Sequence, residues 1–195
     1  MDRNLQTLLA ELAQFGADND AAKPERGRRM LNITPDTGQF LAVLVHAMQA
    51  RRVLEIGTSN GYSTLWLADA ARAIGGTVTT VEYAADKVAL AVHNFERAGL
   101  AGAIQQVAGD AGAALAGMAA GQVDLLFLDS ERSQYVDWWP ALRRVLRPGG
   151  LLVVDNAVSH AAEMAAFCAL VSGDPGFTTA LVPVGNGEFL ATASA

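Results

Sequence analysis

The stretch VLEIGTSNGYSTLWLA, residues 53–68, begins as an apolar run and passes through a turn that contains two glycines. It then continues with apolar residues at helical spacing. A strand that leads through a glycine turn into a helix is a common way for α/β proteins to present backbone N–H groups to a ligand. The turn is therefore a candidate ligand-binding loop, and its spacing limits which ligand it can hold.

Two well-known glycine loops do not fit this spacing. A phosphate-binding P-loop has a lysine and then a serine or threonine after its second glycine, whereas Gly61 is followed by Tyr62 and Ser63. The dinucleotide fingerprint G-x-G-x-x-G also fails, because Ser59 stands two positions after Gly57. A nicotinamide-dependent dehydrogenase is therefore the least favoured function.

The remaining pattern joins an acidic residue to two spaced glycines. Glu55 ends the apolar run, Gly57 permits a tight turn, and Gly61 lets the backbone approach a ligand near the helix start. Free N–H groups at that helix start favour a carboxylate. Glu82 ends the next apolar run, where it could accept hydrogen bonds from ribose hydroxyls. The pattern favours a nucleoside without a 2′-phosphate, and a simple corner with a solvated glutamate is the alternative.

Five apolar runs alternate with helix-like segments along the chain. The runs cover residues 51–57, 76–82, 103–109, 123–129 and 150–156, and helices are expected to begin near Tyr62, Ala84, Ala111, Ser133 and Ser159. Strands that alternate with helices predict a mostly parallel sheet with helices on both faces. The tail, residues 177–193, has two β-rich runs around GNG and predicts an antiparallel hairpin. Together these runs predict a seven-stranded α/β sheet.

The first 50 residues have a different pattern. Apolar residues recur at helical spacing in the first segment, at Leu5, Leu8, Leu9, Leu12 and Phe15. The apolar face of this amphipathic helix must be buried against another surface, and a partner subunit is one candidate. The segment TPDTGQFLAVLVHAMQA (34–50) predicts a second helix. We predict one domain over residues 1–195, with a helical extension over 1–50 and a Rossmann-like core over 51–195.

Composition narrows the partners and the compartment. The 195 residues carry a net charge of −6, which weakly disfavours a nucleic-acid partner. Cys168 is the only cysteine, so neither an intramolecular disulfide nor a cysteine-based metal site can form. We find no signal-peptide pattern and no apolar stretch of membrane-spanning length, so the cytoplasm is the expected location.

Oxygen donors end two of the apolar runs. Asp129 follows VDLLFL, and Asp155 and Asn156 follow GLLVV. Ligands of open α/β sheets bind beyond the carboxyl ends of the strands, so these side chains could converge there on one hard cation such as Mg²⁺. The alternative is that Asp129 caps a helix or touches a cofactor, while Asp155 and Asn156 form a turn.

Taken together, these motifs resemble a known family. EIGTSNGYS (55–63), VEY (81–83) and GDA (109–111) resemble the S-adenosylmethionine site of class I methyltransferases. With TPDTGQFL (34–41), the chain is similar to the catechol and caffeoyl-CoA type O-methyltransferases over residues 34–195. The resemblance implies their Rossmann-like fold, with S-adenosylmethionine and a divalent metal, expected to be Mg²⁺.

The resemblance also implies roles for individual residues. Glu55 would lie near the methionine amino group, Ser63 would hold the methionine carboxylate, and Glu82 would hold the ribose. Tyr83 and Asp110 would lie by the adenine. The other expected cofactor contacts are Gly57, Ser59, Gly61, Tyr62, Ala111 and Asp129. The implied metal ligands are Asp129, Asp155 and Asn156.

One position departs from the family pattern. The family has Asp-x-x-Lys, with the lysine as general base, whereas DSER places Arg132 there. Arginine stays protonated, so this base is lost. Either the metal alone acidifies the acceptor hydroxyl, or Glu131 or His160 takes the proton. Arg132 could instead clamp an anionic group. The candidate catalytic residues are Asp129, Arg132 and His160.

The expected function is methyl transfer from S-adenosylmethionine to a metal-assisted hydroxyl of a small catechol-like or phenolic acceptor. One alternative is a metal-independent methyltransferase with His160 or Glu131 as base and a nitrogen acceptor among its options. Another is a cofactor-binding module without turnover, and a modified tRNA nucleoside stays open as acceptor. The leucine-rich first helix and YVDWW (135–139) favour a homodimer, although the aromatic residues fit a core equally well.

Overall fold

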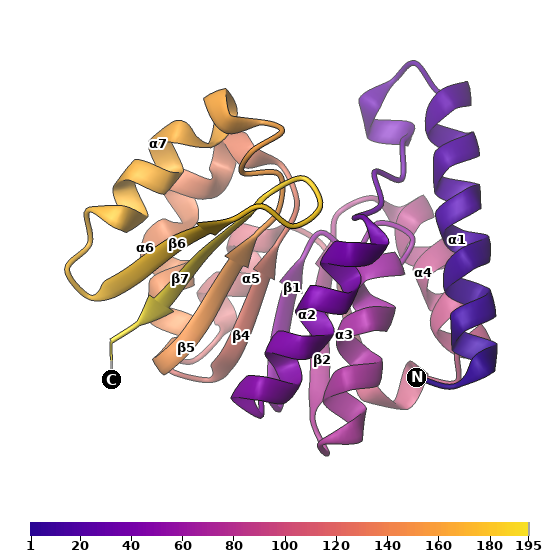
Figure 1. The fold of residues 1–195 in the computed structure, drawn as a ribbon, viewed down its shortest axis with the longest axis horizontal. Helices are drawn as coiled ribbons and strands as arrows, with labels where there is room; N and C mark the ends of the chain where they lie inside the picture. Colours follow the sequence, from indigo (N-terminus) through magenta and orange to yellow (C-terminus); the bar gives the residue numbers. More distant parts are fainter. Residues whose placement is uncertain (195) are drawn as a thin grey trace.

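The computed structural model describes residues 1–194 as seven strands and seven α-helices, with three short 3₁₀ helices (Figure 1). The α-helices are α1 (Arg3–Ala22), α2 (Pro35–Met48), α3 (Tyr62–Ala73), α4 (Ala85–Arg97), α5 (Ala111–Gly117), α6 (Tyr135–Val145) and α7 (Ala161–Ser172). The strands are β1 (Arg52–Ile56), β2 (Thr77–Glu82), β3 (Ile104–Ala108), β4 (Val123–Leu128), β5 (Leu146–Val154), β6 (Phe177–Val182) and β7 (Glu188–Ala193). The 3₁₀ helices are η1 (Arg26–Arg28), η2 (Ala101–Ala103) and η3 (Arg132–Gln134).

The strands form one sheet in the order β3-β2-β1-β4-β5-β7-β6. The five strands from β1 to β5 pair in parallel, whereas β7 runs antiparallel to both β5 and β6. The predicted seven-stranded sheet with an antiparallel C-terminal hairpin is therefore confirmed. Strand order reverses between β1 and β4, and this switch point is where α/β sheets open a ligand site.

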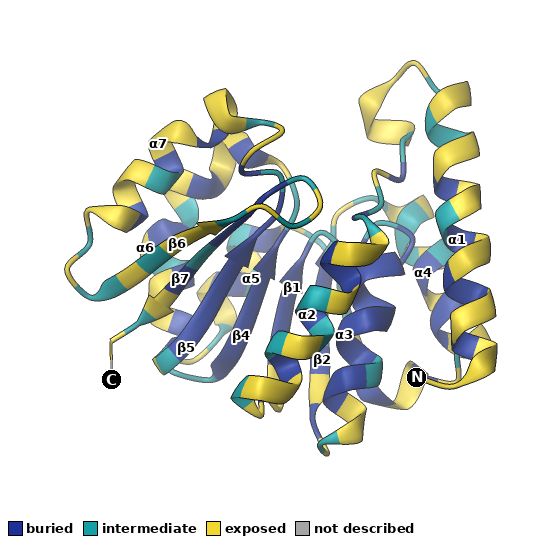
Figure 2. Ribbon diagram, in the orientation of Figure 1, coloured by how far each residue is buried: buried dark blue, intermediate teal, exposed yellow. Residues whose placement is uncertain are grey.

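Successive side chains of each strand point to opposite faces of the sheet, so the core is divided into two layers. In β1, Val53 packs with helices α1 to α4, whereas Leu54 and Ile56 pack with α5 to α7. Because both faces are covered, β4 is buried at every position, which accounts for its unbroken apolar run. Figure 2 shows this distribution, with buried strands inside and exposed residues on the outer surfaces of the helices.

The leucine stripe of α1 is covered by the chain itself. Leu5, Leu8, Leu9 and Leu12 are each at most 4% exposed and belong to the same core cluster as Leu65 of α3. Phe15 instead stays 44% exposed. In the sequence, the leucine pattern had favoured a partner subunit. The structure removes that reason, because burial within one chain already satisfies the pattern.

Side-chain caps account for several helix starts. Thr34 accepts a hydrogen bond from the Thr37 N–H, and Pro35 opens α2. Asp110 caps α5 in the same way through the Ala113 N–H. Helix α6 ends at Val145, and the RPGG motif, residues 147–150, lies inside β5. Among residues 1–194, no helix is both long enough and apolar enough to cross a membrane.

Candidate functional site

The carboxyl ends of β1 to β5 open into one cleft with a volume of about 1060 Å³. This volume lies at the upper end of the range for small-molecule sites, so the cleft has room for a cofactor and a second small molecule. A wall of the cleft comes from residues 26–33, which return from α1 across the strand ends. The sequence had not indicated any role for that segment.

The glycine loop and Glu82 form one preorganised unit. The Glu82 carboxylate accepts hydrogen bonds from the backbone N–H groups of Ser59 at 2.8 Å and Ala84 at 2.9 Å. The Ser59 hydroxyl donates to the Met30 carbonyl at 2.7 Å, which ties the loop to the N-terminal wall. The carboxylate is therefore fixed in the cleft wall and keeps lone pairs for ribose-type hydroxyls.

Glu55 lies beneath the glycine loop rather than in the cleft wall. Its side chain is fully buried and accepts hydrogen bonds from Ser63 at 2.5 Å, from Thr80 at 2.6 Å and from Thr64. Burial raises the pKa of Glu55 to about 7, although the three hydroxyl donors oppose this shift. Glu55 does not line the cleft, and its expected place near the methionine amino group stays a prediction. In this structure Glu55 supports Ser63, which does line the cleft.

The two glycines are required by packing. A Cβ on Gly57 would lie 1.9 Å from the Asp129 carbonyl oxygen, and Gly57 has a φ of +106°. A Cβ on Gly61 would lie 2.5 Å from the Phe95 ring of α4. Gly57 lines the cleft, whereas Gly61 does not, and the expected ligand contact of Gly61 stays a prediction. Gly61 instead lets α3 and α4 approach each other closely.

The remaining expected cofactor residues lie along one side of the cleft. Tyr62 is buried, whereas Tyr83 is 82% exposed at the cleft edge. Asp110 and Ala111 line the cleft where β3 leads into α5. The cleft thus offers the exposed tyrosine ring and the Asp110 carboxylate after β2 and β3, and Ser63 and the start of α3 after the neighbouring strand β1.

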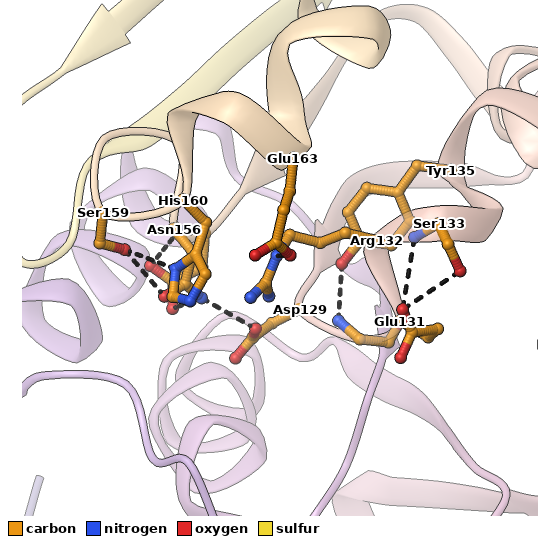
Figure 3. A network of polar contacts seen from close by, with 11 residues as sticks. Asp129, Glu131, Arg132, Ser133, Tyr135, Asn156, Ser159, His160 and Glu163 are labelled. Atoms are coloured by element: carbon orange, nitrogen blue, oxygen red, sulfur yellow. Dashed lines mark hydrogen bonds and ion pairs between the residues drawn. The ribbon is translucent and has the colours of Figure 1, made fainter. Parts of the chain in front are cut away.

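The three expected metal ligands lie together. The Asn156 Nδ2 group donates to Asp129 Oδ1 at 3.2 Å and to Asp155 Oδ2 at 2.9 Å (Figure 3). The pKa of Asp129 is held well above its usual range, first by burial of the Asp129 carboxyl group and then by the charge of Asp155. Burial also raises the pKa of Asp155. Two close carboxylates that disfavour each other's charge, with an amide beside them, form a donor set suited to a divalent cation.

The amide is turned so that its nitrogen, not its oxygen, meets the two carboxylates. Its Oδ1 accepts from Ser159 instead, at 3.2 Å. Residues 1–194 contain no group of three or more His, Cys, Asp or Glu side chains placed to hold a metal ion, and this set has only two such members. The donor chemistry fits a hard cation, and the amide would have to present its oxygen to take part.

A further buried carboxyl group, that of Glu188, lies next to Asp155 and was missed from the sequence. Glu188 of β7 is fully buried and accepts a hydrogen bond from the Thr37 hydroxyl at 3.0 Å. Burial and the charge of Asp155 raise the pKa of Glu188 to about 10, so it is neutral at pH 7. It can therefore donate a hydrogen bond to Asp155. The sequence pattern assigned Glu188 no role, because only the fold brings β7 beside β5.

Arg132 lies in the same part of the cleft as the acidic pair. Its side chain is 5% exposed, and Nε donates to Glu163 Oε2 of α7 at 2.9 Å. This pairing lowers the pKa of Glu163. Figure 3 shows the guanidinium of Arg132 between Glu163 and Asp129. The protonated group at this position cannot act as a base, as the sequence indicated.

The two expected proton acceptors differ in their surroundings. His160 precedes α7 and lines the cleft beside Asn156, with Nδ1 at 2.9 Å from the Ser159 hydroxyl. Glu131 is exposed at the cleft edge, where its carboxylate accepts from the Ser133 hydroxyl at 3.1 Å. His160 therefore lies closer to the acidic cluster, whereas Glu131 is engaged in capping η3.

Comparisons with known proteins agree with this architecture. The sequence model of the O-methyltransferase family matches residues 2–193. A catechol O-methyltransferase of Mycobacterium tuberculosis is 40% identical over 149 residues, which are 75% of this chain and 64% of that protein. One of Niastella koreensis is 36% identical over 149 residues, covering 75% and 66%. The match to this chain thus spans just under two thirds of the length of these relatives.

Solved structures share the fold over more of their length. Cofactor-bound Rv0187 from MTB superposes with a TM-score of 0.80 at 32% identity, covering 93% of this chain and 88% of that one. An O-methyltransferase from Bacillus cereus in complex with SAH has a TM-score of 0.81 at 27% identity, covering 96% and 91%. The sheet order, the cleft and these matches agree, so the chain belongs to the O-methyltransferase family.

Proposed function

We propose that this chain transfers a methyl group from S-adenosylmethionine to a hydroxyl oxygen of a small catechol-like or phenolic acceptor, assisted by a divalent metal. The observation that carries the proposal is that one cleft contains both the Glu82 loop and the cluster of Asp129, Asp155 and Asn156. The catechol O-methyltransferase relatives support the choice of acceptor. The net charge of −6 also favours a small molecule over nucleic acid. A cytoplasmic location and a homodimer stay predictions.

S-adenosylmethionine supplies a methyl group on a sulfonium, which is already an activated leaving group, so the protein needs no covalent nucleophile. The task of the chain is to bind and orient. Glu82, held by two backbone N–H groups, would bind the ribose hydroxyls. Ser63 and the start of α3 would hold the methionine carboxylate, and Tyr83 would cover the adenine.

Asp129, Asp155 and Asn156 would hold the divalent cation, which when bound lowers the pKa of an acceptor hydroxyl. These side chains follow the neighbouring strands β4 and β5. The acceptor hydroxyl would therefore be held at the same edge of the sheet as the cofactor. His160 lies at this end of the cleft and is our candidate for receiving the hydroxyl proton. The role of His160 replaces that of the lysine in the family pattern.

A metal-independent enzyme is the second candidate. The observation that favours it is that the Asn156 amide already contacts both carboxylates through its N–H groups. His160 or Glu131 would then act as the base. A cofactor-binding module without turnover is favoured only by Arg132 at the expected base position, and methylation of any hydroxyl acceptor would exclude it.

Calorimetry with S-adenosylhomocysteine tests the cofactor site. We expect Glu82→Ala to weaken binding of S-adenosylhomocysteine at least about tenfold, because it removes the carboxylate that would accept two charge-assisted hydrogen bonds from the ribose hydroxyls. Glu96→Ala, on the exposed surface of α4, is the matched control and should bind as the wild type does. Absence of binding to the wild-type chain at millimolar concentration would overturn the proposed function.

Chelation then separates the two enzyme mechanisms. With metal assistance, exhaustive EDTA treatment removes methyl transfer and Mg²⁺ restores it, while Asp155→Ala no longer responds to Mg²⁺ yet still binds S-adenosylhomocysteine. Full activity after chelation would support the metal-independent enzyme. Measuring cofactor binding in parallel shows that any loss of rate is not a loss of the fold.

A further inference from the structure

One serine hydroxyl connects the cleft with a buried carboxyl group. The Ser63 hydroxyl donates to Glu55 Oε1 at 2.5 Å, and Ser63 lines the cleft, whereas Glu55 is fully buried and does not. Two further hydroxyls donate to the other oxygen of Glu55, that of Thr80 at 2.6 Å and that of Thr64. Neither threonine lines the cleft. Ser63 is therefore the member of this cluster through which a ligand in the cleft can act on Glu55.

The hydrogen atoms of this cluster can be counted. A serine or threonine hydroxyl has a single hydrogen to donate, and an ionised carboxylate can only accept. While Glu55 is ionised, all three hydroxyls direct their hydrogens to it. The Ser63 oxygen then offers only lone pairs to a ligand. Lone pairs repel a carboxylate, which is the group that the proposed function brings to Ser63 and the start of α3.

One added proton reverses the direction of this hydrogen bond. A protonated Glu55 can donate to the Ser63 oxygen, and the Ser63 hydrogen is then free to donate to a ligand carboxylate. Such a proton is accessible near neutral pH, because burial raises the pKa of Glu55 to about 7. A ligand carboxylate at Ser63 would add a negative charge nearby and would favour the protonated form further.

The charged groups around Glu55 also favour its protonated form. Strands β2 and β4 flank β1, and they bring two acidic residues, Glu82 at the end of β2 and Asp129 after β4. Helix α3 contributes hydroxyls, because its charged residues Asp69 and Arg72 pair with each other in its later turns. The charged and titratable residues of α2 and α4 are exposed, apart from Lys87, which donates to a backbone carbonyl of the N-terminal wall at 2.7 Å.

We propose that Glu55 is a positioning residue that takes up one proton when S-adenosylmethionine binds, so that the Ser63 hydroxyl donates to the methionine carboxylate. The proton comes from solvent and is held on a Glu55 oxygen, so the site gains no net negative charge when the ligand carboxylate enters. This inference rests on the proposed function, which places that carboxylate at Ser63. It adds a coupling between cofactor binding and the protonation of a residue outside the cleft.

Two other roles of Glu55 give different proton counts. If Glu55 instead pairs with the methionine ammonium group, cofactor binding stabilises the ionised carboxylate and releases protons. If Glu55 only fixes the start of α3, its protonation does not change when the cofactor binds. The sign and size of the proton exchange on binding therefore separate the three roles.

The experiment is calorimetry of S-adenosylhomocysteine binding in buffers that differ in ionisation enthalpy, because the difference in heat gives the number of protons exchanged. We expect the wild-type chain to take up about 0.8 proton at pH 8, where Glu55 is mostly ionised before binding, and about 0.1 proton at pH 6. The affinity is complete below the pKa of about 7 and is lost above it. The dissociation constant should therefore rise about tenfold from pH 7 to pH 8.5.

Three variants assign this exchange to the cluster. Glu55→Gln has a permanent N–H donor and no charge, so its proton uptake should fall close to zero and its dissociation constant should be the same at pH 7 and pH 8.5. Ser63→Ala keeps the carboxyl group but removes the hydroxyl, and it should lower the uptake at pH 8 to less than half. Glu96→Gln, which changes an exposed carboxylate of α4, is the matched control and should keep the wild-type uptake.

Each outcome bears on the inference or on the proposed function. Proton release, or binding without proton exchange at pH 8, would overturn the inference and leave the function standing. Wild-type uptake by Ser63→Ala would also overturn it, because repulsion through space would then suffice. If Glu55→Gln does not fold, the wild-type proton count and Ser63→Ala still decide. Absence of S-adenosylhomocysteine binding at both pH values would overturn the function and the inference together. Proton uptake by a chain that methylates no hydroxyl acceptor would support the inference and contradict the proposed methyl transfer.

Discussion

At the scale of single residues, the site depends on groups held away from water. Glu55 does not touch the cleft, yet its carboxyl group accepts hydrogen bonds from three hydroxyls that fix the start of α3. A hydroxyl has a single hydrogen to donate. While Ser63 donates to Glu55, it offers a ligand only its lone pairs and its backbone N–H. When Glu55 is protonated, the proton can lie between them and free the Ser63 hydroxyl to donate elsewhere.

The pKa of Glu55 leads to a prediction about stability. Because this pKa is about 7 in the folded chain and 4.5 in an unperturbed glutamate, the folded state binds the proton more tightly. The contribution of Glu55 to the free energy of unfolding is therefore largest below pH 4.5. It falls by about 3 kcal/mol as the pH rises to 7, and is constant above that.

The Glu55→Gln variant is neutral at every pH and should lack this contribution. Urea denaturation at pH 5 and pH 8 should therefore show the variant gaining stability relative to the wild type at the higher pH. Thr64→Val removes one donor to the carboxylate and should steepen the wild-type dependence. Parallel stability curves for Glu55→Gln and the wild type would contradict the assigned pKa.

At the scale of elements, the segment between α1 and α2 forms part of the site. The Asp20 carboxylate accepts from the Met30 N–H at 2.6 Å and from the Leu31 N–H at 2.8 Å. Leu31 has a φ of +51°, a left-handed conformation that is costly for leucine and that these hydrogen bonds hold. Asp20 therefore fixes the path by which η1 and Arg26 reach the cleft.

Removing this anchor should loosen the wall without unfolding the sheet. For Asp20→Ala we expect a loss of about 1–2 kcal/mol in stability, since the lost hydrogen bonds are charge-assisted but partly exposed to water. Trypsin cleavage after Arg26, Arg28 or Arg29 should become faster, and the dissociation constant for S-adenosylhomocysteine should rise severalfold.

Asp18→Ala is the control for that experiment. Asp18 lies on the same helix, and within residues 1–194 its carboxylate accepts a side-chain hydrogen bond only from the exposed Gln14. Its cleavage rate and affinity should equal those of the wild type. Equal protease resistance of Asp20→Ala and the wild type would show that the wall is held by other contacts, such as the bond between Ser59 and Met30.

At the scale of the whole molecule, α1 belongs to the core that covers one face of the sheet. Its leucines pack with α2, α3 and the sheet in one cluster, and the ion pair of Glu11 with Arg97 ties the middle of α1 to the end of α4. The N-terminal helices therefore cover a face that would otherwise expose Leu65 and its neighbours to water. A homodimer, if it forms, must use a different surface from the leucine stripe.

This packing predicts how substitutions on α1 act. Leu8→Ala should lower the free energy of unfolding by about 3 kcal/mol, because it removes a fully packed side chain and leaves a cavity. The loss should be the same at every protein concentration. Phe15→Ala is the control on the same helix, and it should cost less than about 1 kcal/mol because the ring is 44% exposed.

The measurement is urea denaturation of each variant over a hundredfold range of protein concentration. If a partner subunit covered α1, the wild-type transition midpoint would rise with concentration and Leu8→Ala would reduce that dependence. Such a result would contradict burial of the stripe within one chain.

The sequence by itself determined the order of strands and helices and the presence of a hairpin at the end. These depend on local periodicity, on turn residues and on the apolar runs that two covered faces require. It also placed Asp129 and Asp155 at strand ends, and since parallel strands end at one edge of a sheet, their proximity followed. Arg132 could be recognised as a departure from a motif, because a motif is a property of neighbouring residues.

Only the tertiary structure decided which side chains face the cleft and which support it. Glu55 and Gly61 belong to the glycine motif, yet one is buried under Ser63 and the other packs on Phe95. Glu188 and Arg26 are far in sequence from the motifs, yet the fold brings Glu188 next to Asp155 and Arg26 to the wall of the cleft. The physical reason is that burial and charge depend on neighbours from distant segments, and local sequence patterns carry no information about those neighbours.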